Sequence, residues 1–365
     1  MTNLVVMAKP KVKFILTKRK PKEFISYCSA INQAIDEEMA LDKSVFVIGG
    51  ETKMFGSLAG LEEKYGVERV ITTPISEDAT TGLVLGAALS GLRPIQVHIR
   101  VDFLLLAVNQ VINMISTATF ASDGKVKCPI LIRAVVGRGW GQGYQHSKSL
   151  HGLFAQIPGL KLIMPTTPND AKGMIKQAIK SNSPVICLEH RWLYWQEEEL
   201  LNDFSGIDYG VPGKIQSGGD VTVIASSWMN VEASLAAKIL SDKHDISVDL
   251  FDIRSTESLN NLTEVYDSIR KTGRCIIGDN DWLSSGLSGE ITYHIQKNCL
   301  GDLTTSIERV GFKDTPCGTA RHLEDEFYPN AFDIVRCVEK MVGVGPCAVE
   351  EYKLFSHETK FKGPF

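Results

Sequence analysis

Short apolar runs alternate along the first half of the chain with longer stretches whose apolar residues recur at helical spacing. The runs predict strands and the longer stretches predict amphipathic helices. We expect strands at about 45–48, 69–72, 93–99, 129–136, 161–164 and 184–188. We expect helices at about 24–41, 77–91, 103–119 and 168–181. Regular alternation of strand and helix is typical of an α/β layer around a parallel sheet.

The alternation stops at a polar, acidic and glycine-rich passage after residue 189 and then resumes. Further strands are expected at 220–225, 246–251, 274–278 and 304–309, with helices at 229–241, 262–271, 286–296 and 330–342. The pattern predicts two doubly wound α/β domains with mainly parallel sheets, and 365 residues suit two domains. We divide the chain into a basic leader (1–22), a first domain (23–200), a linker (201–218), a second domain (219–345) and a tail (346–365).

Charge and hydropathy exclude two classes of partner. The chain carries 43 acidic and 39 basic side chains, so it lacks the strongly basic character of a nucleic-acid binder. Its longest apolar runs, such as 103–108, are far shorter than the ~18–20 residues of a membrane span. We therefore expect neither nucleic acid nor a membrane as a partner.

The leader and the cysteines predict a cytoplasmic protein. Residues 1–22 hold seven basic side chains and no acid, without the apolar core or cleavage site of a secretion signal. The eight cysteines are scattered and form no C-x-x-C pair. They are typical of reduced thiols rather than disulfides or metal ligands. We expect this chain to bind no metal.

A glycine-rich segment, 137–143, follows a predicted strand. It does not open a helix, as the glycines of a dinucleotide-binding loop would. Glycines permit the backbone angles of a loop that covers an active site, and we favour that interpretation. His146 and His151 come directly after it, where the ligands of open α/β sheets gather.

Glu77 lies in Pro74-Ile75-Ser76-Glu77-Asp78, at a strand-to-helix turn. One interpretation is that its carboxylate complements the helix dipole. The other is a carboxylate held at a sheet edge, where it shares a proton with a bound base. Spacing alone does not decide between them.

Long ordered motifs connect this chain to a known family. The order PISE, GAALSGLRPI, DF, NQ, QHS, PGL, NDAKG and SPV resembles the β subunits of thiamine-diphosphate-dependent 2-oxo acid dehydrogenases. More broadly, it resembles the pyrimidine-binding half of transketolase-like enzymes. The resemblance runs from about residue 23 to about 342. It implies a transketolase-like pyrimidine-binding domain followed by a transketolase C-terminal-type domain.

The resemblance also implies roles for site residues. Glu77 matches the glutamate that bonds the N1′ nitrogen of the cofactor's aminopyrimidine ring, and Phe103 matches an aromatic that stacks on this ring. His146 matches the histidine that faces substrate. His98 and Arg100 depart from the commoner aromatic pattern, which leaves open a different acid or a phosphate-bearing sugar as substrate.

Gln145 and His151 are further candidates for the substrate or loop region. Gln145 directly precedes His146 in the QHS motif, and His151 lies five residues beyond His146. Both follow the glycine-rich segment that we expect to cover the site.

One family motif is missing. Thiamine enzymes hold magnesium diphosphate with a G-D-G motif followed by asparagine, whereas Gly278-Asp279-Asn280 lacks the last glycine. We interpret this tripeptide as a strand-end turn. The resemblance then implies that a separate α subunit holds the diphosphate and magnesium, in an α2β2 heterotetramer. A lipoyl acyltransferase is a further expected partner.

Three functions remain open at this point. The first is the β subunit of an enzyme that decarboxylates a 2-oxo acid and transfers the acyl group to lipoamide. The second is the C-terminal half of a split transketolase, or another carboligase acting on ketose-type substrates. The third is a non-catalytic paralogue with a binding or regulatory role.

Overall fold

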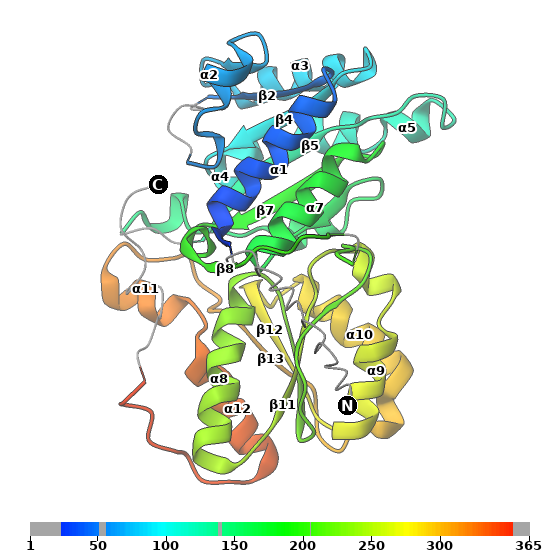
Figure 1. Cartoon of the computed structure of the whole chain (residues 1–365). Coiled ribbons are helices and arrows are strands. Elements are labelled where there is room, and N and C mark those ends of the chain that lie inside the picture. The colour runs from blue at the N-terminus through cyan, green and yellow to red at the C-terminus, as the bar shows by residue number, and fades with distance from the viewer. Residues whose placement is uncertain (1–22, 51–55, 138–140, 205, 353–365) are drawn as a thin grey trace, which may run out of the picture.

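Two domains, each built around its own sheet, make up the protein (Figure 1). The computed structural model describes residues 23–50, 56–137, 141–204 and 206–352. The basic leader, part of the glycine-rich loop and the end of the tail lie outside the described residues.

The first domain is centred on six parallel strands in the order β3-β2-β4-β5-β7-β6. They are β2 (Val45–Gly49), β3 (Val70–Thr72), β4 (Arg93–His98), β5 (Leu131–Val136), β6 (Lys161–Ile163) and β7 (Val185–His190). Each lies within a few residues of a predicted strand. Most of their residues are buried, as expected for a parallel sheet covered on both faces.

Helices cover both faces of this sheet. α1 (Tyr27–Leu41) and α7 (Pro168–Lys180) pack together on one face (Figure 1). α3 (Glu77–Leu89) packs on the other. Two short helices, α2 (Leu61–Tyr65) and α6 (His151–Ala155), were not predicted as such.

The chain does not enter α1 at residue 24. Residues 24–26 instead form β1 (Phe24–Ser26), which pairs antiparallel with β8 (Glu197–Glu199). Ser26 ends the strand and caps the helix, because its hydroxyl accepts a hydrogen bond from the Ser29 N–H. This correction shortens the predicted helix by one turn.

The predicted helix at 103–119 is broken into pieces. α4 (Val101–Leu104) passes into a 3₁₀ turn, a π-helical stretch (Gln110–Ile115) and α5 (Ala118–Ala121). The hydroxyls of Ser116 and Thr117 donate to backbone carbonyls four residues earlier, a bonding pattern that bends helices. Apolar periodicity predicts the helical content here but not the interruption.

The second domain holds a five-stranded sheet in the order β13-β12-β10-β11-β9. The strands are β9 (Gly213–Gln216), β10 (Val221–Ala225), β11 (Val248–Asp252), β12 (Cys275–Trp282) and β13 (Glu308–Phe312). All neighbours are parallel except β9, which pairs antiparallel with β11 at the sheet edge. Residues 213–216 of the predicted linker therefore belong to this sheet.

Four long helices flank the second sheet, two on each side (Figure 1). α8 (Trp228–His244) and α12 (Ala331–Val342) cover one face, and α9 (Thr263–Thr272) and α10 (Leu287–Cys299) cover the other. α11 (Arg321–Phe327) was not predicted. One apolar cluster contains side chains of both domains, so the two are packed against each other.

β12 runs four residues beyond its predicted end. Gly278-Asp279-Asn280 therefore lies inside a strand and is not a strand-end turn. The polar side chains of Asp279, Asn280 and Asp281 are buried because the first domain provides their partners. The sequence predicts a turn here because it does not show the distant partners that allow these polar side chains to be buried in a strand.

Among the described residues, no single helix has the length and apolar character needed to cross a membrane. Val101–Ala107 and Gln110–Ala121 meet the length and composition criteria only as a pair, and they are bent by 64°.

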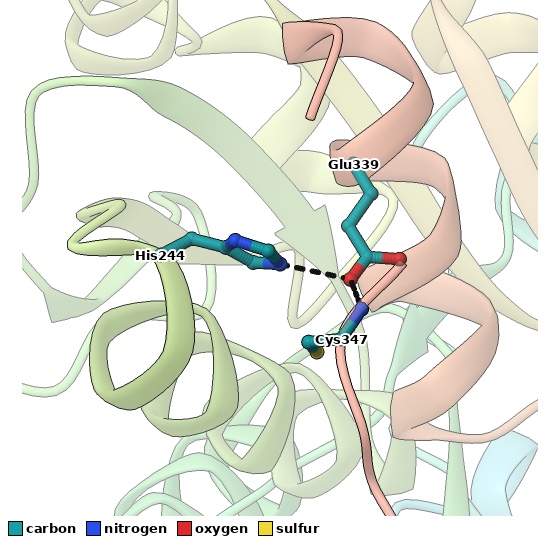
Figure 2. A group of neighbouring side chains, drawn as sticks. All are labelled: His244, Glu339 and Cys347. Atoms are coloured by element: carbon teal, nitrogen blue, oxygen red, sulfur yellow. Dashed lines mark hydrogen bonds and ion pairs between the residues drawn. The ribbon is translucent and has the colours of Figure 1, made fainter. Parts of the chain in front are cut away.

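A carboxylate ties the C-terminal tail to two helices. Nε2 of His244 lies 2.9 Å from Oε1 of Glu339, and the Cys347 N–H donates to the same oxygen at 2.7 Å (Figure 2). Arg336 donates to the other oxygen at 2.7 Å. His244, Glu339 and Cys347 bear metal-ligating atoms within 4.8 Å of one another. Because both oxygens already accept hydrogen bonds, we interpret the group as a clamp on the tail.

Replacing Glu339 by glutamine is expected to lower the free energy of unfolding by about 1–3 kcal/mol. Burial alone would raise the pKa of Glu339, but hydrogen bonds from Cys347, His244 and Arg336 lower it to about 2. The carboxylate thus contributes stability that is present above its ordinary pKa of 4.5 and is lost as the pH falls toward 2. Thermal midpoints measured from pH 3 to 7 should decline less steeply in Glu339→Gln. Glu350→Gln, an exposed acid of the same tail, is the control, and equal profiles for both variants would contradict the clamp.

Candidate active site

A cavity of about 470 Å³ lies at the carboxyl ends of β2, β3 and β4. Its walls come from the glycines that end β2, from the turn between β3 and α3, and from the segment joining β4 to α4. Gln142 and His146 complete the lining. Ligands of parallel α/β sheets bind at this edge. The cavity also has the size of a small-molecule site.

Glu77 is the first residue of α3 and lines the cavity. Its carboxylate is half-buried and forms no hydrogen bond or ion pair with the other described residues, whereas its backbone carbonyl accepts from Thr81. The helix therefore fixes the backbone of Glu77 and leaves the carboxylate available to a ligand.

Phe103 and His146 meet edge to face in the same cavity. Their ring centroids are 5.3 Å apart and the rings are inclined by 81°. Phe103 stays 38% exposed although it is a large apolar residue. A half-exposed aromatic beside a polar ring offers an apolar surface to a flat ligand.

Two histidines of the cavity favour the neutral form. Burial lowers the pKa of His98 to about 4. Burial, followed by the charge of Arg100, lowers the pKa of His146. Within the described part of the chain, His98 Nε2 and His146 Nδ1 have no hydrogen-bond partner. Both rings can therefore exchange hydrogen bonds with a ligand at neutral pH.

Arg100 and Gln142 form the wall on the side of the glycine-rich loop. Arg100 is buried and donates to the carbonyl of Gly137 at 2.5 Å and to the side-chain oxygen of Gln142. Gln145 is exposed and does not line the cavity. Gln142, which directly precedes the 3₁₀ turn at Gly143–Gln145, lines the cavity, whereas the role of Gln145 in the substrate or loop region stays a prediction.

His151 lies outside the cavity, between the two domains. It is the first residue of α6, and its Nε2 is 2.6 Å from a carboxylate oxygen of Asp279. Nδ1 lies 3.7 Å from Asp281. The structure thus places His151 in an ion pair across the domain interface and not among the residues that line the cavity, and its role in the substrate or loop region stays a prediction.

Two protein-family profiles match this chain. The profile of the family "Transketolase, pyrimidine binding domain" matches residues 23–196. The profile "Transketolase, C-terminal domain" matches residues 213–334. Together they span most of the described chain.

Several curated proteins are similar over most of their length. The β subunit of the acetoin:2,6-dichlorophenolindophenol oxidoreductase of Cupriavidus necator is 34% identical over 87% of this chain and 97% of its own. The 2-oxoisovalerate dehydrogenase β subunit of Bacillus subtilis is 36% identical over 80% and 90%. A mitochondrial pyruvate dehydrogenase E1 component subunit β-2 of Oryza sativa is 35% identical over 85% and 84%. This chain belongs to the E1 β-subunit family of 2-oxo acid dehydrogenases.

The fold of this E1 β-type chain extends beyond its sequence relatives. A solved structure described as a split-gene transketolase, an inactive β4 tetramer, superposes with a TM-score of 0.68. It covers 88% of this chain and 99% of its own at 19% identity. At that identity the likeness establishes the two-domain transketolase-like fold alone.

Some residues that line the E1 β-type cavity were not predicted from the sequence. Gln96 is buried on β4, its amide N–H donates to Thr81 at 2.8 Å, and its oxygen has no partner in the described chain. Gln142 also lines the cavity and was not predicted. Gln96 is a polar residue near the end of a buried strand, and this position could have indicated that it lines the site.

Proposed function

We propose that this chain is the β subunit of a cytoplasmic, thiamine-diphosphate-dependent α/β enzyme that decarboxylates a 2-oxo acid and transfers the acyl group to lipoamide. One observation carries the proposal: a half-buried carboxylate, an aromatic ring and a neutral histidine line one cavity at the edge of the sheet. They are Glu77, Phe103 and His146, in the order expected for the family.

The cavity suits the aminopyrimidine half of the cofactor. Glu77 offers a hydrogen-bond acceptor, and Phe103 offers an apolar face. Among the described residues, the unpartnered polar atoms of Gln96, His98 and His146 also belong to cavity-lining side chains. A buried polar atom without a partner costs about 1–3 kcal/mol, which a bound heterocycle with donors and acceptors would recover.

Glu77, Phe103 and His146 would each have a different role in the reaction. Glu77 would hold a proton shared with a ring nitrogen of the cofactor, and Phe103 would restrict the ring's position. His146, kept neutral by its surroundings, would exchange a proton or hydrogen bond with a substrate oxygen. When bound, thiamine diphosphate supplies the electron sink for decarboxylation.

The diphosphate and magnesium would be held by an α subunit. Asp279, in the tripeptide nearest to a diphosphate motif, is occupied by His151 at the domain interface. The proposed assembly is an α2β2 heterotetramer, with a lipoyl acyltransferase accepting the acyl group. A split transketolase is the second candidate, because Arg100 places a cation at the cavity.

Reconstitution with the α partner tests the proposal. The purified complex should decarboxylate 2-oxo acids and reduce an artificial electron acceptor only when thiamine diphosphate and magnesium are present. Each subunit alone should show no turnover. Ketol transfer between sugars without decarboxylation would favour the split transketolase. No cofactor-dependent reaction with either substrate class would contradict the proposal.

A further inference from the structure

Arg100 is a buried cation at the wall of the cavity. It directly precedes α4, without a capping hydrogen bond from its side chain, and only 3% of its surface is exposed. Within the described residues its guanidinium forms two hydrogen bonds, to the carbonyl of Gly137 at 2.5 Å and to the amide oxygen of Gln142. Both acceptors are neutral, so hydrogen bonding does not balance the charge.

The nearby carboxylate of Asp102 pairs with a different cation. Its Oδ1 lies 2.9 Å from Lys148 Nζ, whereas its buried Oδ2 has no hydrogen-bond partner in the described part of the chain. A second guanidinium, that of Arg191, donates at 3.3 Å to the same Gln142 oxygen that Arg100 uses. Two buried guanidinium groups thus converge on one amide oxygen. Their mutual effect is seen in the pKa of Arg191, which burial and then Arg100 lower to about 9.

This arrangement has the chemistry of an anion subsite. A guanidinium holds carboxylate or phosphate oxygens through paired N–H groups, and such charge-assisted bonds are stronger than neutral ones. A buried charge is costly unless it is paired, so an anionic ligand would be favoured here. The carbonyl and amide acceptors hold Arg100 in place and leave its charge available.

We infer that Arg100, positioned by Gln142, forms a subsite for a second anionic group of the substrate, a carboxylate or a phosphate. The inference rests on the proposed function and names its substrate class. The substrate is a 2-oxo acid or ketose with an anionic group besides the one at the reacting carbon. Arg100 determines specificity, and the chemistry at the reacting carbon remains with Glu77 and His146.

Specificity ratios test the subsite. The reconstituted complex is assayed with 2-oxoglutarate, with fructose 6-phosphate and an aldose acceptor, and with pyruvate, to distinguish a carboxylate tail, a phosphate tail and no anionic tail. Arg100→Met should reduce kcat/KM for the preferred anionic substrate relative to pyruvate by at least about 10-fold. Arg100→Lys should restore part of the ratio. Arg270→Met, an exposed arginine on α9, should leave the ratio unchanged.

Equal losses on all substrates in Arg100→Met would overturn the inference, because they would place Arg100 at the reacting carboxylate. The inference would also be overturned if the wild-type complex preferred pyruvate to both anionic substrates.

A binding measurement separates this inference from the proposed function. The thermal midpoint of the complex is measured with succinate, with inorganic phosphate and with sodium chloride at matched ionic strength. One of the two anions should stabilise the wild type and Arg270→Met but not Arg100→Met. This result would support the subsite even if no 2-oxo acid is turned over. Equal stabilisation of the wild type and Arg100→Met overturns the subsite, whatever the turnover.

Discussion

Replacing Glu77 by glutamine is expected to lower the turnover of the reconstituted complex by about 100- to 10,000-fold, the range that a positioned acid–base group contributes. Glutamine keeps the size of the side chain but cannot hold or release the proton. The fold should tolerate the change, because the carboxylate has no hydrogen-bond partner in the described part of the chain. Turnover with saturating thiamine diphosphate is the measurement.

Asp78→Asn is the matched control for Glu77→Gln. Asp78 is an exposed carboxylate in the first turn of the same helix, so its loss removes an equal charge from the helix N-terminus. If Glu77 only complements the helix dipole, both variants should lose a few tenths of a kcal/mol of stability and keep full turnover. Full turnover of Glu77→Gln would therefore contradict the catalytic assignment. Loss of turnover in Glu77→Gln but not in Asp78→Asn would support it.

The sequence predicts the cavity because its residues follow the strands. Glu77 stands just after β3, and His98 and Arg100 stand at the end of β4. Parallel strands bring their carboxyl ends to one edge of a sheet, so local patterns place these side chains close together. Buried apolar runs locate the strands themselves for the same reason.

Contacts between distant segments are where prediction from local pattern fails. His151 and Asp279 are 128 residues apart, and neither neighbourhood indicates the other. The unforeseen partner explains why the sequence predicts that β12 ends at residue 278, and why it does not place His151 at the domain interface. The prediction of one continuous helix at 103–119 is wrong for a different reason. Side-chain hydroxyls there compete with the hydrogen bonds of the helix.

Replacing His151 by alanine is expected to lower the free energy of unfolding by about 3–5 kcal/mol, the cost of breaking a buried ion pair. His151 is 2% exposed and Asp279 is 3% exposed, so neither has water as an alternative partner. Removing the ring leaves Asp279 and Asp281 buried beside each other without the cation between them. Chemical denaturation of the full chain measures the loss, and His294→Asn is the control because its pair with Glu290 lies on an exposed helix face. Equal midpoints for His151→Ala and the control would contradict the predicted cost.

The pH dependence of unfolding separates the ion pair from simple packing. Burial alone would lower the pKa of His151, but the charges of Asp279 and Asp281 raise it to about 9. A group whose pKa is raised by folding contributes stability that is complete below its unfolded value of about 6.5 and is lost as the pH rises through 9. The wild type should therefore lose on the order of 3 kcal/mol across this window. His151→Gln, which fills the site without a titrating charge, should lose much less, and parallel curves for the two proteins would assign His151 a packing role alone.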